Sequence, residues 1–246
     1  MAAAVSSGPN ACEKSQRTIV HEILDSKLPP HDKSFQRVFE DVSSVSGAGI
    51  ETPGGVLRLI FFHAFSNTEI LQKLRTELED AKASHSDVRE LKVLEKLPYL
   101  TSTIMEGLRL SPGTATRMAR IAPDRDLFYK EWPIPAGTPV GMTTILMHTD
   151  ERLYPDPYSF DPERWMNEQG RKSSDKAYAP FSKGTRMCLG MHLAWAEMYL
   201  VLATLVQRFD FQFTRAKAED FECDSDQFVI GTKGKGQLEA FVKLCE

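Results

Sequence analysis

Apolar residues recur at helical spacing over much of the first half of the chain, which places them on one face of a helix. This pattern predicts helices over Thr18–Leu28, Ser34–Ser66, Glu69–Ala83 and Tyr99–Leu110. Asn67 follows the second helix directly, and its short polar side chain is typical of a residue that caps the start of the next one. The first part of the chain is therefore expected to be helical.

Two features interrupt this helical pattern. Residues 1–16 are small and polar and show no periodicity, so they are expected to form a disordered lead-in. Pro53 and the pair Gly54-Gly55 lie in the middle of the long second helix. Since proline removes a backbone hydrogen bond, we expect a kink there.

The second half of the chain changes character. Residues 113–157 hold short β-prone pieces between prolines and glycines, which indicates short hairpins, and residues 156–171 form an aromatic-rich meander. Leu189–Phe209 is apolar on almost every face and predicts a helix buried on most sides. Phe228–Val242 predicts a terminal hairpin. The expected fold class is mainly α with minor β, as one domain over residues 17–246.

Composition narrows the class of protein. Of the 246 residues 41% are hydrophobic and 26% charged, and the net charge is −4, which argues against nucleic acid as the main partner. No apolar stretch near the start is long enough to span a bilayer, and no secretory signal is present. The four cysteines lie far apart and form no C-x-x-C pair, so an intracellular, cytoplasmic protein without disulfides is expected.

The stretch F-S-K-G-T-R-M-C-L-G carries the strongest chemical signal. Cys188 lies between Gly184 and Gly190, which let a backbone approach a flat ligand, and it precedes a helix whose N-terminus stabilises a thiolate. Arg186 is placed to pair with a carboxylate of that ligand, and Phe181 to keep water from the sulfur. Taken alone, the cysteine is as well explained as a small buried hydrophobe.

A second signal is the pair Glu106 and Arg109. One helical turn separates them, so they lie on one face and can form an ion pair. By itself such a pair is more often an exposed one of little energetic consequence.

These motifs together resemble the cytochrome P450 family. The stretch Phe181 to Gly190 fits every fixed position of its haem-binding signature, Phe-x-x-Gly-x-Arg-x-Cys-x-Gly. E-G-L-R at 106–109 fits the family's Glu-x-x-Arg, P-E-R-W at 162–165 its Pro-Glu-Arg-Phe/Trp element, and A-G-I-E-T at 48–52 its oxygen-activation motif. All four occur in the family's order, and the phrasing is most similar to fungal monooxygenases of secondary metabolism.

The resemblance implies a role for each site residue. Cys188 would be the axial thiolate ligand of haem b, and Glu106, Arg109 and Arg164 a network that locks the meander beneath it. Glu51 and Thr52 would relay protons during oxygen activation, with Pro53 as the departure from the family's pattern. Arg117 and His148 would lie near the haem propionates, and residues 113–116 on the substrate side. His148 taken alone is more often a structural histidine.

The implied function is a haem-thiolate monooxygenase that hydroxylates an apolar small molecule with dioxygen and takes electrons from NADPH through a reductase. Family members are typically found at the endoplasmic reticulum membrane. The matched region is the C-terminal half of the family's haem domain, and the N-terminal half and membrane anchor have no counterpart in the sequence. Two alternatives stay open: a truncated, inactive relative, and a non-redox module that binds a partner or templates a cyclisation.

Overall fold

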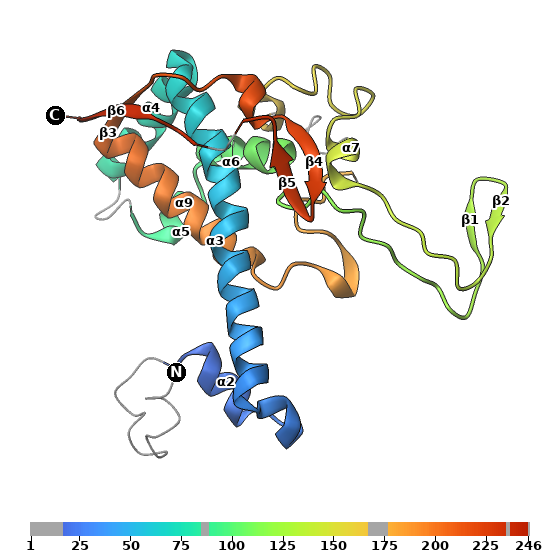
Figure 1. The fold of residues 1–246 in the computed structure, drawn as a ribbon. Coiled ribbons are helices and arrows are strands. Elements are labelled where there is room, and N and C mark those ends of the chain that lie inside the picture. The colour runs from blue at the N-terminus through green and yellow to red at the C-terminus, as the bar shows by residue number, and fades with distance from the viewer. Residues whose placement is uncertain (1–16, 85–88, 167–176, 235–236, 246) are drawn as a thin grey trace. The chain divides into compact units, whose positions relative to one another are not determined.

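A computed structural model describes residues 17–84, 89–166, 177–234 and 237–245. The chain divides into two compact units, Met1–Glu51 and Thr52–Glu246, which are described separately. Figure 1 traces the elements from the N-terminus to the C-terminus.

The described part of the first unit is helical. It contains α2 (Ile19–Asp25), the 3-10 helix η2 (Pro30–Lys33) and the first part of α3 (Phe35–Ser66). The predicted first and second helices are thus confirmed. The α3 helix continues through Pro53 without ending, and the kink expected there stays a prediction.

The second unit holds the remaining helices and the core. Asn67 caps α4, because its Oδ1 accepts the amides of Glu69 at 3.0 Å and Ile70 at 3.3 Å, as predicted. The helices are α4 (Thr68–Ser84), α5 (Leu91–Leu94), α6 (Pro98–Leu110), α7 (Thr144–His148) and α9 (Met191–Arg208). The fully buried core residues come from α3, α4, α6 and α9 and include Ile60, Leu74, Leu78, Leu100, Ile104, Met198, Leu202 and Val206.

The α9 helix corrects one expectation. The sequence predicted burial on most sides, but Leu193 is 58% exposed and Leu200 40% exposed, while Met198 and Leu202 are fully buried. Within the described residues, α9 contacts α4, α5, α6 and β3, which cover one of its faces. An apolar helix can be buried on any of its faces, and the elements that pack against it decide which of those faces are buried.

The described residues of this unit also form three two-stranded antiparallel sheets. The expected short hairpin in the middle of the chain is β1 (Leu127–Tyr129) with β2 (Trp132–Ile134). The predicted terminal hairpin over Phe228–Val242 is wrong, because its two strands pair with other partners. The pairs are β4 (Cys223–Gln227) with β5 (Val229–Thr232), and β3 (Phe209–Phe213) with β6 (Ala240–Leu244).

The α6 helix is the centre of this unit, and two contacts fix its place. A Cβ atom added at Gly107 would lie 2.3 Å from Cγ1 of Ile60, so α6 and α3 approach as closely as they do only because this residue is glycine. At the other end, the carboxylate of Glu77 on α4 accepts the amides of Tyr99 and Leu100, both at 2.8 Å. These amides belong to the first turn of α6 and lack partners within the helix.

Among the described residues, no helix is both long and apolar enough to cross a membrane.

Candidate functional site

The α6 helix places Glu106 and Arg109 on one buried face. Both side chains are fully buried, and Arg109 donates from Nε to Glu106 Oε2 at 2.8 Å and from Nη2 to Oε1 at 2.7 Å. This bidentate geometry is the strongest arrangement for a guanidinium and a carboxylate. The alternative of an exposed, weak ion pair is therefore wrong for this pair.

The meander supplies three further donors to the same carboxylate. Arg164 Nε lies 3.2 Å and the amide of Asp161 3.0 Å from Glu106 Oε1, and the indole Nε1 of Trp165 donates to Oε2 at 2.9 Å. Trp165 is almost completely buried. Glu106 thus accepts five hydrogen bonds, and the structure brings Glu106, Arg109 and Arg164 together. The sequence did not predict that Trp165 binds Glu106. Its position directly after Arg164 was the feature that could have indicated this.

Arg109 uses its remaining donors to hold the chain beyond α6. It donates to the carbonyl oxygens of His148 at 2.8 Å, Pro157 at 2.6 Å and Ser159 at 3.0 Å. The ring of Tyr154 lies 5.3 Å from its guanidinium carbon. A single buried cation therefore ties α6 to α7 and to the meander.

His148 is buried, and both of its ring nitrogens are occupied. Its Nε2 accepts the amide of Ala179 at 3.0 Å, so Nδ1 carries the proton and donates to the carbonyl of Arg109 at 3.0 Å. Burial lowers the pKa of His148 to about 4, which keeps the ring neutral. These bonds describe a structural role, and the haem contact expected for His148 stays a prediction.

The cysteine loop, Phe181–Cys188, begins two residues after Ala179. The amide of Cys188 donates to the carbonyl of Phe181 at 2.9 Å, which closes the loop around the 3-10 helix η4 (Gly184–Arg186). Gly184 has a φ of +77°, a left-handed conformation that favours glycine. The Cys188 side chain is exposed. Cys188 is therefore not a buried core thiol, and that alternative is wrong.

The sequence assigned Arg117, Arg186 and Phe181 to the same site as this thiol. Arg117 and Arg186 are exposed, and neither forms an ion pair with any residue in the described ranges. Phe181 packs against Trp195 of α9, with ring centroids 6.2 Å apart. Phe181 therefore anchors the start of the loop on the helix that follows it.

Thr52 lies beside the segment that follows α6. A Cβ atom added at Gly113 would be 3.4 Å from Cβ of Thr52, and the Gly113 carbonyl accepts the amide of Ile230 on β5. The amide of Ala115 in turn donates to the carbonyl of Phe228, at the turn between β4 and β5, at 3.0 Å. Thr52, residues 113–116 and this hairpin are thus brought together. That they border a substrate stays a prediction. Glu51 is exposed and belongs to the first unit.

The residues present fit a haem group. An exposed thiol stands in a closed loop, and added Cβ atoms at Gly184 and Gly190 would meet nothing within 4 Å, so the backbone is open to a flat ligand there. Leu189 next to the cysteine is 90% exposed and offers apolar surface. Arg186 is exposed in the same loop and forms no ion pair within the described ranges, so its guanidinium suits a carboxylate such as a haem propionate. The same role for Arg117 stays a prediction.

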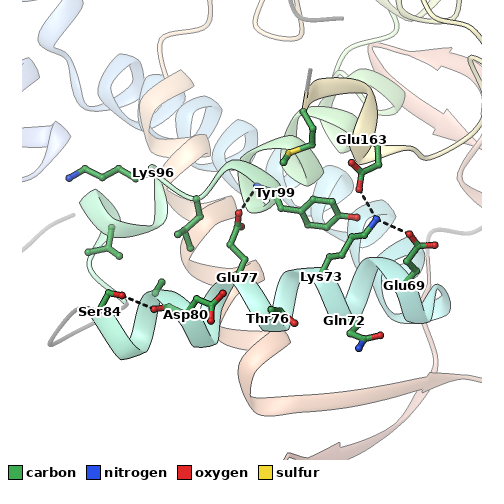
Figure 2. Close-up of a pocket in the computed structure, with 14 residues that line it drawn as sticks. Glu69, Gln72, Lys73, Thr76, Glu77, Asp80, Ser84, Lys96, Tyr99 and Glu163 are labelled. Atoms are coloured by element: carbon green, nitrogen blue, oxygen red, sulfur yellow. Dashed lines mark hydrogen bonds and ion pairs between the residues drawn. The ribbon is translucent and has the colours of Figure 1, made fainter. Parts of the chain in front are cut away.

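A groove with a volume of about 870 Å³ lies elsewhere, between α4, α5, the start of α6 and the meander (Figure 2). Its lining includes none of the predicted site residues. Lys73 crosses it to reach both Glu69 and Glu163 at 2.7 Å, and Glu77 is occupied by the α6 amides. These charges hold α4 against its neighbours, so the groove does not change the assignment of the site.

Known proteins with similar sequences include fungal cytochrome P450 monooxygenases. The chain is 43% identical over 195 residues to the cytochrome P450 monooxygenase MO6277 of Ascocoryne sarcoides, covering 79% of this chain and 38% of that protein. It is 41% identical to the N-acetyltryptophan 6-hydroxylase ivoC of Emericella nidulans, covering 86% of this chain and 42% of that protein. It is also 41% identical to the tryptophan 6-hydroxylase fscE of Fusarium equiseti, with 87% and 42% covered.

The fold is similar to a solved one. The structure matches the retinoic acid bound cyanobacterial CYP120A1 with a TM-score of 0.79 at 24% sequence identity, covering 99% of this chain and 53% of that one. The chain thus spans about two fifths of the length of these fungal relatives and about half of this structure. Residues 5–238 match the family model "Cytochrome P450". With the Cys188 loop and the buried Glu106 network, this match shows that the chain belongs to the cytochrome P450 family.

Proposed function

We propose that this chain is the haem-binding part of a monooxygenase that hydroxylates an apolar small molecule in fungal secondary metabolism. The observation that carries the proposal is the closed loop Phe181–Cys188, which leaves the thiol exposed beside an open backbone. The names of two relatives, hydroxylases of tryptophan and N-acetyltryptophan, support hydroxylation of a small molecule. In this proposal residues 17–246 correspond to the C-terminal half of the haem domain.

The chain's own residues would hold haem b in place. The Cys188 thiolate would hold the haem iron, and the Cys188 amide fixes the loop by donating to the Phe181 carbonyl. Arg117 and Arg186 would pair with the two propionates. When bound, haem with a thiolate ligand supplies the redox chemistry that activates dioxygen. Electrons would come from NADPH through a reductase.

The Glu106 network would keep this loop in position. Arg109 donates a hydrogen bond to the backbone carbonyl of His148. The ring of His148 accepts a hydrogen bond from the amide of Ala179, two residues before Phe181. The buried ion pair on α6 is therefore connected to the cysteine loop through two hydrogen bonds to His148 and two further residues of chain. A change at Glu106 is expected to reach the position of the thiol.

Thr52 and Glu51 would hold the protons that oxygen activation consumes. In this proposal the Thr52 hydroxyl and the Glu51 carboxyl each act as a general acid, as the resemblance of A-G-I-E-T to the family's motif implies. Thr52 also lies against Gly113, so the substrate would be bordered by residues 113–116 and the β4–β5 turn.

The test is haem binding through Cys188. Purified protein is titrated with haem, reduced, and exposed to carbon monoxide, and the difference spectrum is recorded. We expect the red-shifted band of a thiolate-ligated haem. Cys188→Ser should lose this band, while Cys223→Ser, a matched change at another exposed thiol, should keep it.

Two outcomes would contradict the proposal. Folded protein without any thiolate-type band would favour the inactive alternative. A band that survives Cys188→Ser would place the ligand at another residue. A further assay adds a reductase, NADPH and a panel of indoles to the haem-loaded protein. If haem binds but no product forms, Cys188 is still the ligand, but the proposed hydroxylation of such substrates is refuted.

A further inference from the structure

The groove between α4, α5, the start of α6 and the meander has the size of a small-molecule site. Its volume of about 870 Å³ lies in the range of about 300–1,000 Å³ that is usual for pockets that bind small organic molecules. All of its lining residues belong to the second unit, and none of them belongs to the predicted haem site. The groove can therefore hold a ligand of its own.

One part of the groove already holds an ammonium group between two carboxylates. The Nζ of Lys73 lies 2.7 Å from Oε1 of Glu69 and 2.7 Å from Oε1 of Glu163. It also lies 5.7 Å from the centre of the Tyr99 ring (Figure 2). Carboxylates and aromatic faces are surroundings that attract organic cations. The protein's own side chain thus shows which charge this groove accommodates.

Another part of the groove carries two carboxylates that no described cation neutralises. Glu77 and Asp80 are three residues apart on α4, so they lie on one face of the helix. Neither forms an ion pair with a residue in the ranges that the structure describes. Since like charges one turn apart repel each other, a cation placed beside both would be stabilised.

The surroundings of Glu77 strengthen this preference for a cation. Its carboxylate is partly buried and accepts the amides of Tyr99 and Leu100, both at 2.8 Å. Burial raises the pKa of Glu77 above its ordinary value of 4.5, although the two hydrogen bonds act in the opposite direction. A positive charge bound next to this carboxylate would offset its loss of hydration.

Apolar side chains supply another part of the lining. They come from three segments, as Val93 of α5, Leu97 directly before α6, and Met166 of the meander. Met166 is 40% exposed, and a methionine side chain adapts its shape to different apolar ligands. A ligand that matches the whole lining is therefore positively charged in one place and apolar in the rest.

The lining as a whole has two more negative than positive charges, from Glu69, Glu77, Asp80 and Glu163 against Lys73 and Lys96. We propose that this groove binds a small organic cation with an apolar body, a quaternary or protonated amine, whose charge lies beside Glu77 and Asp80. The groove is separate from Cys188, so the inference does not rest on the proposed function.

The first experiment titrates the purified protein with hexyltrimethylammonium in a calorimeter. A quaternary nitrogen has no lone pair and cannot bind haem iron, so the result is the same question with or without haem. Heptanoate has a similar chain and a negative charge, and it should bind about tenfold more weakly or not at all, because it meets like charges. Equal affinity for both compounds, or no binding of the cation, would overturn the proposal.

The second experiment locates the ligand with two changes of opposite expected sign. Asp80→Asn should weaken binding of hexyltrimethylammonium about two- to fivefold, and Lys96→Gln should strengthen it by a similar factor, as is usual when one exposed charge is removed. Glu79→Gln and Lys92→Gln are the matched controls, because they remove the same charges from exposed positions of α4 and α5 outside the lining. Both controls should bind as the wild type does.

The four variants separate this groove from any other surface. Equal affinities in all four would refute the proposal and place the ligand elsewhere on the protein. Added salt should weaken binding to the wild type and reduce its difference from Asp80→Asn, because exposed charges are screened. Far-UV circular dichroism checks that every variant is folded.

Discussion

Replacing Glu106 by glutamine tests whether the buried network holds the second unit together. The side chain keeps its shape, but an NH₂ group now faces donors on one side, either Arg109 Nε and Trp165 Nε1 or the three groups that meet Oε1. The fully buried Arg109 also loses its counter-charge. Breaking a buried pair in this way costs about 3–5 kcal/mol, a large share of the stability of a domain.

The assay is thermal unfolding followed by circular dichroism. At about 2–4 °C for each kcal/mol in a domain of this size, Glu106→Gln should lower the midpoint by about 6–20 °C. Glu69→Gln is the matched control, because Glu69 forms an exposed ion pair with Lys73 at 2.7 Å and its removal should leave the midpoint unchanged. Midpoints that fall equally little in both variants would refute the reasoning that burial makes the Glu106 pair indispensable.

Two further predictions concern packing and pH. Gly107→Ala should destabilise the protein by about 1–2 kcal/mol in urea unfolding, since the new methyl group meets buried Ile60. Gly47→Ala on α3 is the control and should be neutral or stabilising, because a Cβ atom there has nothing within 4 Å. Equal effects of the two substitutions would contradict the close approach of α6 to α3. Burial lowers the pKa of His63 and His148 to about 4, below the 6.5 of the unfolded chain. The unfolded state therefore binds more protons between these values, so stability is full above pH 6.5 and falls toward pH 4. Each histidine should cost about 2 kcal/mol by pH 5, and a urea midpoint that stays constant from pH 7 to 5 would contradict this burial.

The sequence by itself determined the helices and the candidate chemistry. Helical periodicity and the cap at Asn67 depend on residues close together in the chain, so the boundary between α3 and α4 was predictable to about a residue or two. The spacing of Glu106 and Arg109 places both on one helix face for the same reason. The Cys188 motif was visible in one short stretch, although its role stays a prediction.

Tertiary structure decided the partners of these residues. Nothing local to Trp165 shows that its indole donates to Glu106, because 59 positions separate them. The same holds for His148, whose ring joins the end of α6 to the start of the cysteine loop. Such contacts depend on how α6, α7 and the meander fold over one another.

Strand pairing and burial were also decided at this level. The strand at Val229–Thr232 and the strand at Ala240–Leu244 have hairpin-like spacing, yet each pairs with an earlier strand. The apolar residues of α9 could all be buried, but the described neighbours cover only the face with Met198 and Leu202. Hydrogen bonding and periodicity along the chain determine which elements form, whereas the pairing of edges and faces depends on contacts between distant segments, which no local pattern encodes.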